Sequence, residues 1–301
     1  MPPDWVESIC SRGFLGVDFF FVLSGFIMMH VHMDDARDTA AAGRYIKKRI
    51  SRIYIPYLPI SIGLIVLYLA LPSVSRVDRD WGLITSLSLF PTDRPPALDV
   101  AWTLVHEMTF YSLFFGSYFT RHSAVATCAW VAGIVAAWTV AWVPPLALLR
   151  ILLAPINLEF VAGVVAALTV RRVPASYWPA FLFAGVFSAA VFVWSDAQET
   201  SRLWFGLSLA PVVVGLVFIE HLGLIPAMRY GLILGNASYA IYLVHNPLIS
   251  VVVRLVMSFH QWQTTLVLCV AVGTLGGLAY HFAVERPAVA WVRSALTKGS
   301  R

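Results

Sequence analysis

The chain has 301 residues and a formal net charge of +5, with 59% hydrophobic and 12% charged residues. So few charged side chains cannot cover a soluble globule of this size, so the composition excludes that class and predicts a polytopic membrane protein. The Lys and Arg residues alternate with apolar runs, which indicates a role in membrane topology and argues against a nucleic-acid partner. The three cysteines lack the spacing of a metal site, and no metal is predicted.

Apolar runs of membrane-spanning length recur along the whole chain. Because a helix needs roughly 20 apolar residues to cross the hydrocarbon, we predict an all-α transmembrane bundle of nine spans, forming a single domain over residues 1–301. The predicted spans lie near residues 14–33, 53–72, 101–120, 124–143, 155–170, 177–195, 203–222, 234–256 and 264–284.

The segment Arg37–Arg52 is the most basic connection between two spans. Since cytoplasmic connections carry an excess of Lys and Arg, we predict that this segment is a cytoplasmic loop of a protein in the cell inner membrane. Alternation from this loop places the C-terminus in the cytoplasm and the tail Met1–Arg12 outside, although no signal peptide precedes that tail. We therefore expect that one helix is missing in front of the first span.

The first span, Gly13–His32, contains the ionisable residue Asp18 and a small polar step, Ser24-Gly25. A charged side chain inside the lipid costs about 2.5 to 3.5 kcal/mol unless it is paired or in contact with water. Such a residue marks a functional site by default, so Asp18 is a candidate for substrate binding.

Arg49 and Arg52 lie at the end of the basic segment, against the apolar run that follows. Guanidinium groups bind phosphate oxygens in a bidentate manner, so this pair is a candidate site for a phosphorylated carrier such as a nucleotide thioester. The alternative is a topology signal that also contacts anionic lipid headgroups, which accounts for the charge on its own.

The connection Ser73–Val100 mixes charged residues with prolines and is predicted to be an ordered loop on the outer side of the membrane. Two roles are open for it. It either covers a substrate site or serves as a solvated connector.

The span near residues 101–120 carries His106 and Glu107 in its outer half. At helical spacing Glu107 shares a face with Tyr111, while Trp102 and His106 form the neighbouring stripe. A carboxylate at this depth can serve as a general base or orient one. Glu107 and His106 are therefore candidate catalytic residues, and Trp102 and Tyr111 are candidate substrate contacts. The alternative is a structural polar clamp between helices.

Tyr242 and His245 fall on one face of the span near residues 234–256. Imidazole exchanges protons near neutral pH, so His245 is a candidate catalytic residue and Tyr242 a candidate substrate contact. A buried histidine whose hydrogen bonds are satisfied fits the same pattern.

Two further acidic positions lie in or near spans. Glu159 is expected either to line the substrate cavity or to pair with an arginine. The sequence Glu285-Arg286-Pro287 is expected to end the last span, with the proline stopping the helix.

Six motifs cover nearly the whole chain. They are GVDFFFVLSGFIM (16–28), KKRISRIYIPY (47–57), WTLVHEMTFY (102–111), PINLEFVAG (155–163), LGNASYAIYLVHNP (234–247) and VERP (284–287). In this order they resemble the integral membrane acyltransferase family three, within its exopolysaccharide-production, O-acetyltransferase-like branch.

The resemblance implies an O-acyltransferase in a lipid membrane. Such an enzyme takes an acyl group, expected to be acetyl, from acyl-CoA and transfers it to a hydroxyl of an extracytoplasmic polysaccharide or glycolipid. Carried over by motif, Ser24 and Gly25 match a step in the family's second helix and are expected to bind substrate. The expected donor site is the basic signature Arg49 and Arg52, and the expected catalytic residues are Glu107 and His245.

Members of this family open with a span that carries an Arg and, about three helical turns later, a His. No such span stands at the front of this sequence, so the resemblance implies a chain truncated at its N-terminus relative to the family's ten core spans. Two other functions stay open: a transporter or flippase-like protein whose buried polar residues line a pathway, and a catalytically inactive scaffold of polysaccharide synthesis.

Overall fold

The computed structural model describes residues 3–71, 80–194, 199–226, 228–256 and 262–298, and every regular element in these ranges is a helix. The chain divides into two compact units. The first unit contains residues 42–105 and 227–301 together with 1–3, and the second unit contains residues 4–41 and 106–226.

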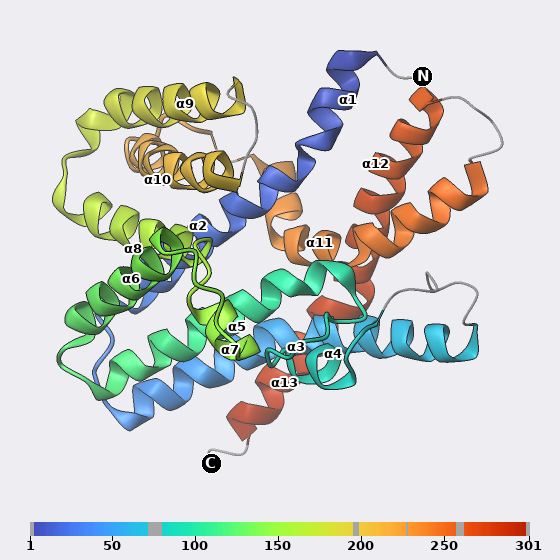
Figure 1. The fold of residues 1–301 in the computed structure, drawn as a ribbon, viewed down its shortest axis with the longest axis horizontal. Helices are drawn as coiled ribbons and strands as arrows, with labels where there is room; N and C mark the ends of the chain where they lie inside the picture. The colour runs from blue at the N-terminus through green and yellow to red at the C-terminus, as the bar shows by residue number, and fades with distance from the viewer. Residues whose placement is uncertain (1–2, 72–79, 195–198, 227, 257–261, 299–301) are drawn as a thin grey trace. The chain divides into compact units, whose positions relative to one another are not determined.

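The second unit begins with the short helix α1 (Asp4–Ser11), which lies in the predicted tail Met1–Arg12. Its other elements are η1 (Gly13–Leu15), α2 (Gly16–His32), most of α5 (Trp102–Gly116), η4 (Ser117–Phe119), α6 (Ser123–Thr139), α7 (Ala147–Leu152), α8 (Asn157–Arg172), η5 (Ala175–Tyr177), α9 (Trp178–Trp194) and α10 (Glu199–His221). In Figure 1, α9 and α10 lie side by side.

Two glycines bring α2 and α8 into backbone contact. A Cβ atom on Gly25 would lie 2.0 Å from the carbonyl oxygen of Phe160, and one on Gly163 would lie 2.0 Å from that of Val22. Small residues allow membrane helices to approach this closely, since without an aqueous hydrophobic effect their association depends on close packing. Gly25 therefore has a packing role in this unit.

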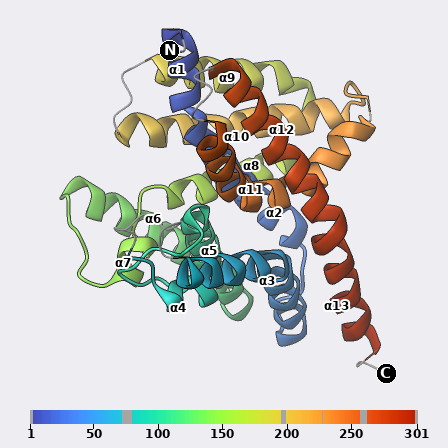
Figure 2. The same cartoon turned by 90° about the vertical axis from the view of Figure 1, so that its right-hand side faces the viewer.

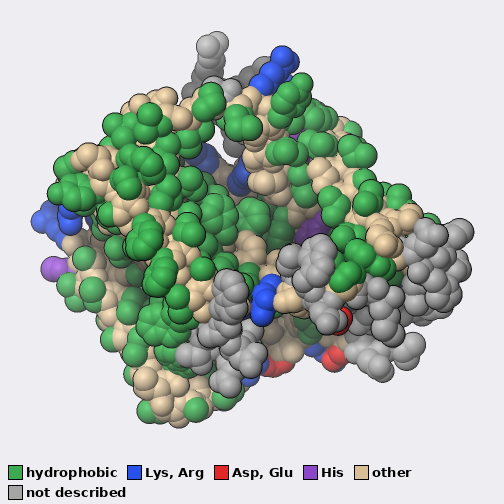
Figure 3. Space-filling model, turned by 90° about the horizontal axis from the view of Figure 1, so that it is seen from above, with side chains coloured by type: hydrophobic (Ala, Val, Ile, Leu, Met, Phe, Trp, Pro, Cys, Tyr) green, Lys and Arg blue, Asp and Glu red, His purple; other side chains and the backbone are tan. Residues whose placement is uncertain are grey.

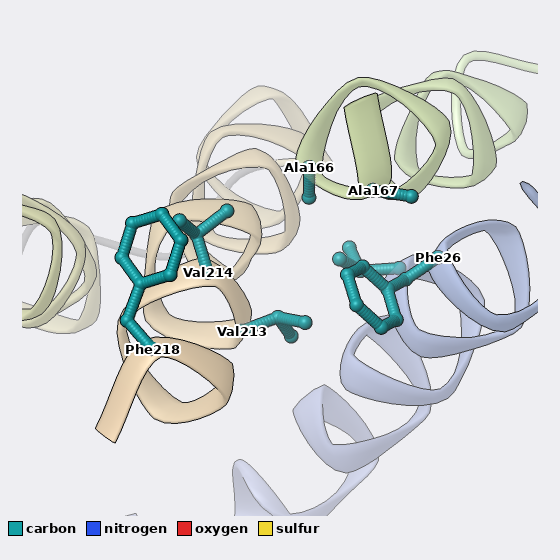
Figure 4. Packing of buried hydrophobic residues seen from close by; sticks show 7 residues of the cluster. Phe26, Ala166, Ala167, Val213, Val214 and Phe218 are labelled. Atoms are coloured by element: carbon teal, nitrogen blue, oxygen red, sulfur yellow. The ribbon is translucent and has the colours of Figure 1, made fainter. Parts of the chain in front are cut away.

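The core of the second unit is an apolar cluster between α2, α8 and α10. Figure 4 shows Phe26 of α2 facing Val213 of α10, with Ala166 and Ala167 of α8 beside them. The small alanine side chains leave room for the larger ones, which is how interlocking helix surfaces reach close packing. This cluster holds α2, the helix that carries Asp18 and Ser24.

The first unit consists of long helices and the folded connection that follows α3. Its elements are most of α3 (Thr39–Ala70), α4 (Leu83–Ser88), η3 (Asp99–Ala101), α11 (Arg229–Val256), α12 (Trp262–Tyr280), the π-helix η7 (His281–Glu285) and α13 (Arg286–Lys298). Helices α11 and α12 pack closely, because a Cβ atom on Gly277 would lie 2.4 Å from the Cα atom of Ile241.

The prediction that the basic segment Arg37–Arg52 is a loop is wrong, because the chain is helical from Thr39 onward. The Asp38 carboxylate accepts a hydrogen bond of 2.7 Å from the Ala41 backbone N–H, which caps the new helix end. Alanine, lysine and arginine are good helix formers, and hydropathy detects only the apolar part of such a helix. The basic side chains therefore lie on a rigid element that continues into the predicted span.

The prediction that Pro287 stops the last helix is wrong. The chain passes from α12 through the π-helical turn into α13, and Figure 2 shows them as one continuous helix. Pro287 is the second residue of α13. Helix α13 directly follows the π-helical turn, where the regular i→i−4 hydrogen-bond pattern is already interrupted, so the N–H that proline lacks does not end the helix.

The connection predicted over Ser73–Val100 is folded in the part that the structure describes, while residues 72–79 lie outside that part. Ser86 of α4 is its buried centre: its Oγ donates to the Gly82 carbonyl at 2.6 Å and accepts from the Ala97 N–H at 2.8 Å. Its carbonyl accepts a hydrogen bond of 2.7 Å from Tyr57 Oη of α3. These bonds fasten the connection to α3.

Six helices in the described part of the chain are long and apolar enough to cross a membrane, with mean hydropathies of 1.5 to 2.0. They are Val6–His32, Thr39–Ala70, Ala175–Val193, Arg202–His221, Arg229–Val256 and Trp262–Val292. The other three predicted spans are also helical, but α5, α6 and α8 have only 15, 17 and 16 residues. Figure 3 shows many hydrophobic side chains exposed at the surface. The protein is a multi-pass membrane protein.

Candidate functional site

Asp18 lies in a buried charged cluster of the second unit. Its side chain is completely buried in α2, and Arg202 Nε of α10 donates to its two carboxylate oxygens at 3.0 and 3.4 Å. A buried carboxylate is costly without a cation beside it, so Arg202 supplies the partner that Asp18 requires. The sequence analysis missed Arg202, although an arginine at the end of an apolar span is the signal that points to such a pair.

Glu159 of α8 adds a second carboxylate to this cluster. It is also completely buried and is a close neighbour of Asp18. A Cβ atom on Gly206 of α10 would lie 2.2 Å from Glu159 Oε1, so the carboxylate is pressed against the backbone of α10. Among the described residues no N–H or O–H group donates to either Glu159 oxygen. The contact of Asp18 and Glu159 with a substrate stays a prediction.

Ser24, Glu107 and Tyr111 form a hydrogen-bonded group in the same unit. Ser24 Oγ donates to Glu107 Oε1 at 3.1 Å, and Tyr111 Oη donates to the same oxygen. The predicted common face of Glu107 and Tyr111 on one helix is therefore confirmed. Two hydroxyl donors on one oxygen fix the orientation of the carboxylate, as is required of a group that accepts a proton from a positioned substrate.

His106 is packed inside the second unit, with only 6% of its surface exposed. Its Nδ1 lies 3.1 Å from Asn157 Oδ1, and the Asn157 amide donates to the carbonyls of Ile151 and Leu152 at 2.6 and 3.1 Å. Because the amide nitrogen faces two acceptors, Oδ1 is the acceptor for His106 and Nδ1 carries the proton. This satisfied pair fits a structural histidine, and the catalytic role of His106 stays a prediction.

Tyr242 and Trp102 belong to the first unit. Tyr242 Oη of α11 donates to the Val100 carbonyl at 2.9 Å and lies 2.7 Å from Thr103 Oγ1. These bonds attach α11 to the end of the folded connection. Trp102, at the start of α5, is 36% exposed, and its contact with a substrate stays a prediction.

His245 lies one helical turn beyond Tyr242 and is half-buried. Its Nδ1 is 2.7 Å from the Tyr242 carbonyl oxygen. Since a carbonyl only accepts, Nδ1 carries the proton, and the neutral imidazole has its lone pair on Nε2. This tautomer is the one in which Nε2 can take a proton from a substrate hydroxyl.

A large basic pocket lies in the first unit, with a volume of about 1120 Å³. We call it the basic pocket; its walls come from the N-terminal half of α3, from α11, from the π-helical turn and from α13. Arg52 projects into it with its guanidinium 5.6 Å from the centre of the Tyr239 ring, a cation–π contact that sequence reasoning missed. The cationic side chains that line the basic pocket are Lys47, Lys48, Arg49, Arg52 and Arg286.

The candidate residues thus form separate groups within the two units. The second unit holds Asp18, Ser24, Gly25, His106, Glu107, Tyr111 and Glu159, and the first unit holds Arg49, Arg52, Trp102, Tyr242 and His245. Chemically, each unit offers one oriented proton acceptor, and the first unit adds a pocket suited to phosphate groups. Within the described part of the chain, no group of three His, Cys, Asp or Glu side chains is arranged to hold a metal ion.

Comparison with known proteins identifies a family for this chain. The family described as "Acyltransferase domain" matches residues 2–281. The exopolysaccharide production protein ExoZ of Rhizobium meliloti (strain 1021) is 31% identical over 288 residues, which cover 91% of this chain and 89% of ExoZ. The acyltransferase MdmB of Streptomyces mycarofaciens is 26% identical, with 93% of this chain and 81% of MdmB covered. No solved structure matches the chain.

The matched family covers most of the chain, and the apolar helices described above are those of a multi-pass membrane protein. The chain belongs to the membrane acyltransferase family three.

Proposed function

We propose that this protein is a membrane O-acyltransferase that transfers an acyl group, expected to be acetyl, from acyl-CoA to a hydroxyl of an extracytoplasmic polysaccharide or glycolipid. Family membership supports the reaction class. The name of the relative ExoZ, an exopolysaccharide production protein, supports a saccharide acceptor. We further propose nine spans in the cell inner membrane, with the basic pocket and the C-terminus on the cytoplasmic side, where acyl-CoA is found.

The basic pocket is the observation that carries this proposal. Coenzyme A bears a pyrophosphate and a ribose phosphate, and five Lys and Arg side chains surround one cavity of about 1120 Å³. Sites for small molecules and cofactors commonly enclose about 300 to 1,000 Å³. The basic pocket is slightly larger than this range, so it has room for a nucleotide. Arginine binds phosphate through two parallel N–H bonds, and Arg49 and Arg52 are the residues that we assign to the phosphates.

The reaction requires a base for the acceptor hydroxyl. The hydroxyl oxygen forms a bond to the thioester carbonyl carbon, its proton passes to the base, and the C–S bond breaks to release the coenzyme A thiolate. Glu107 and His245 are the proposed proton acceptors, since each is held by hydrogen bonds in an orientation that suits this role. We assign Ser24 and Tyr111 to the orientation of Glu107.

The test measures covalent transfer. Cells that lack the gene are complemented with wild type, Glu107→Gln, Arg52→Ala or Ser112→Ala, and the acetyl content of their surface polysaccharide and glycolipid is determined. Ser112 is a matched control, because it is exposed on the same helix as Glu107 and its Oγ donates to the backbone of that helix, at 2.8 Å from the Met108 carbonyl oxygen. We expect acetylation with wild type and Ser112→Ala, and its loss in the other two variants at normal protein levels.

Retention of full acetylation in both Glu107→Gln and Arg52→Ala contradicts the assignment of these residues. A wild-type protein that moves a labelled glycan across the membrane without acetylating it supports the transporter alternative instead. The acetyl measurement and the translocation of a labelled glycan together separate the two classes.

A further inference from the structure

Glu285 is an unusual component of the basic pocket. It is the only acidic side chain among the described residues that line the pocket, and it is almost completely buried, with 3% of its surface exposed. A carboxylate in a pocket for phosphate opposes the binding of the ligand through its charge. Its presence therefore requires a reason other than attraction of the ligand.

The Glu285 carboxylate is fixed from one side and contacts a cation on the other. His281 Nδ1 lies 2.7 Å from Glu285 Oε2, and Arg52 Nη1 lies 3.8 Å from Glu285 Oε1. His281 and Glu285 are the first and last residues of the π-helical turn. Such turns are rare and occur frequently at functional sites.

The Arg52 side chain is 51% exposed. An arginine side chain has several rotatable bonds, so fixing it in one conformation costs entropy. Two groups restrict it: the Tyr239 ring on one face and the Glu285 carboxylate at the guanidinium. The backbone of α3 is fixed to the same neighbours, since Tyr239 Oη donates to the Ile53 carbonyl at 3.2 Å and Tyr280 Oη to the Pro56 carbonyl at 2.7 Å. The backbone that carries Arg52 is thus fixed, and two contacts limit the orientation of its guanidinium.

We infer that Glu285 and His281 are positioning residues that preorganise Arg52 for the phosphate groups of the acyl donor. This inference rests on the proposed function of the basic pocket. His281 orients the carboxylate, the carboxylate holds the guanidinium, and the guanidinium meets the phosphate with little further loss of side-chain freedom. Neither Glu285 nor His281 contacts the acyl group or takes part in the transfer.

Simple electrostatics and a positioning role for Glu285 predict opposite changes in ligand affinity when the Glu285 charge is removed. Removal of a negative charge from a cationic pocket tightens the binding of an anion if charge alone matters. If Glu285 positions Arg52, its neutralisation loosens binding instead, by about three- to tenfold, because the side chain must then be ordered by the ligand itself.

The experiment measures the dissociation constant of coenzyme A for the purified full-length protein in lipid nanodiscs. The variants are Glu285→Gln, Arg52→Ala and the double variant, and Glu220→Gln is the charge-matched control because Glu220 is an exposed acid in the other unit. We expect weaker binding in both single variants, no further loss when Glu285→Gln is added to Arg52→Ala, and wild-type affinity in Glu220→Gln. Tighter or unchanged binding in Glu285→Gln, or an equal loss in both backgrounds, overturns the inference.

A second pair of variants serves if Glu285→Gln does not fold. His281→Ala removes the bond that orients the carboxylate, while His281→Gln retains an N–H donor that can reach it. We expect His281→Ala to weaken coenzyme A binding and His281→Gln to restore it, and equal affinities in the two overturn the inference. A wild-type protein that binds no coenzyme A contradicts the proposed donor site itself, whereas wild-type binding that is lost in Arg52→Ala upholds that site whatever Glu285 does.

Discussion

Replacement of Gly25 by alanine tests the backbone contact between α2 and α8. The added Cβ atom would lie 2.0 Å from the Phe160 carbonyl oxygen, whereas ordinary contacts begin at 3.4 Å. No side-chain rotation can relieve this overlap, so the helices must separate by about 1.4 Å and give up part of their packing energy. Overpacking of this kind costs about 1 to 3 kcal/mol, and more where backbone must move. We expect the upper end of that range, about 2 to 3 kcal/mol.

Thermal unfolding of the purified protein in detergent measures this cost. For a protein of this size, about 2 to 3 kcal/mol corresponds to a melting temperature roughly 4 to 12 °C lower. Gly16→Ala is the matched control, because Gly16 is on the same helix and a Cβ atom added to it would have nothing within 4 Å. If Gly25→Ala melts at the same temperature as Gly16→Ala, the close approach of the two helices is wrong. Normal melting with lost acetylation favours instead the substrate-binding role that the motif predicts for Gly25.

Three further predictions concern the polar groups of the second unit. Asp18→Asn is expected to lower stability by about 1 to 3 kcal/mol, since it removes the carboxylate charge that accepts from Arg202, whose side chain is 29% exposed; an unchanged melting temperature contradicts this. Glu159→Gln is expected to match or exceed wild type in a melting scan, because it replaces a wholly buried carboxyl group with an amide of similar shape, which supplies an N–H donor beside the Asp18 carboxylate. Tyr111→Phe is expected to keep wild-type melting and reduce acetyl transfer about tenfold or more, since it removes one of the two donors that orient Glu107; full activity in this variant shows that the orientation has no catalytic role.

The helices could be predicted well because their signal is local. Each of the nine predicted ranges contains a helix, since an apolar run of sufficient length has few other ways to satisfy its backbone in lipid. The errors lie where hydropathy has no information. The helix from Thr39 carries a polar first third, and the helix beyond Tyr280 continues past a proline, so both ends were placed at the edge of the apolar run.

The candidate site could be predicted only in part. Residues one turn apart on one helix, such as Glu107 and Tyr111, were paired correctly because helical spacing determines their distance. Partners from distant segments were missed: Arg202 is 184 residues from Asp18, and Glu285 reaches Arg52 from the far end of the chain. Such contacts depend on tertiary packing, and a single sequence has no periodic pattern that reports them. For Asp18 the need for a cation was foreseeable, but its identity was not.

The continuous helix from Trp262 to Val292 connects His245 with the basic pocket. Gly273, in its middle, packs against His245, where a Cβ atom would stand 3.5 Å from that of the histidine. Eight residues later, about 12 Å along the axis, the same helix reaches His281, which lines the basic pocket. The position of this one helix therefore determines both the packing around His245 and the wall of the basic pocket that carries His281.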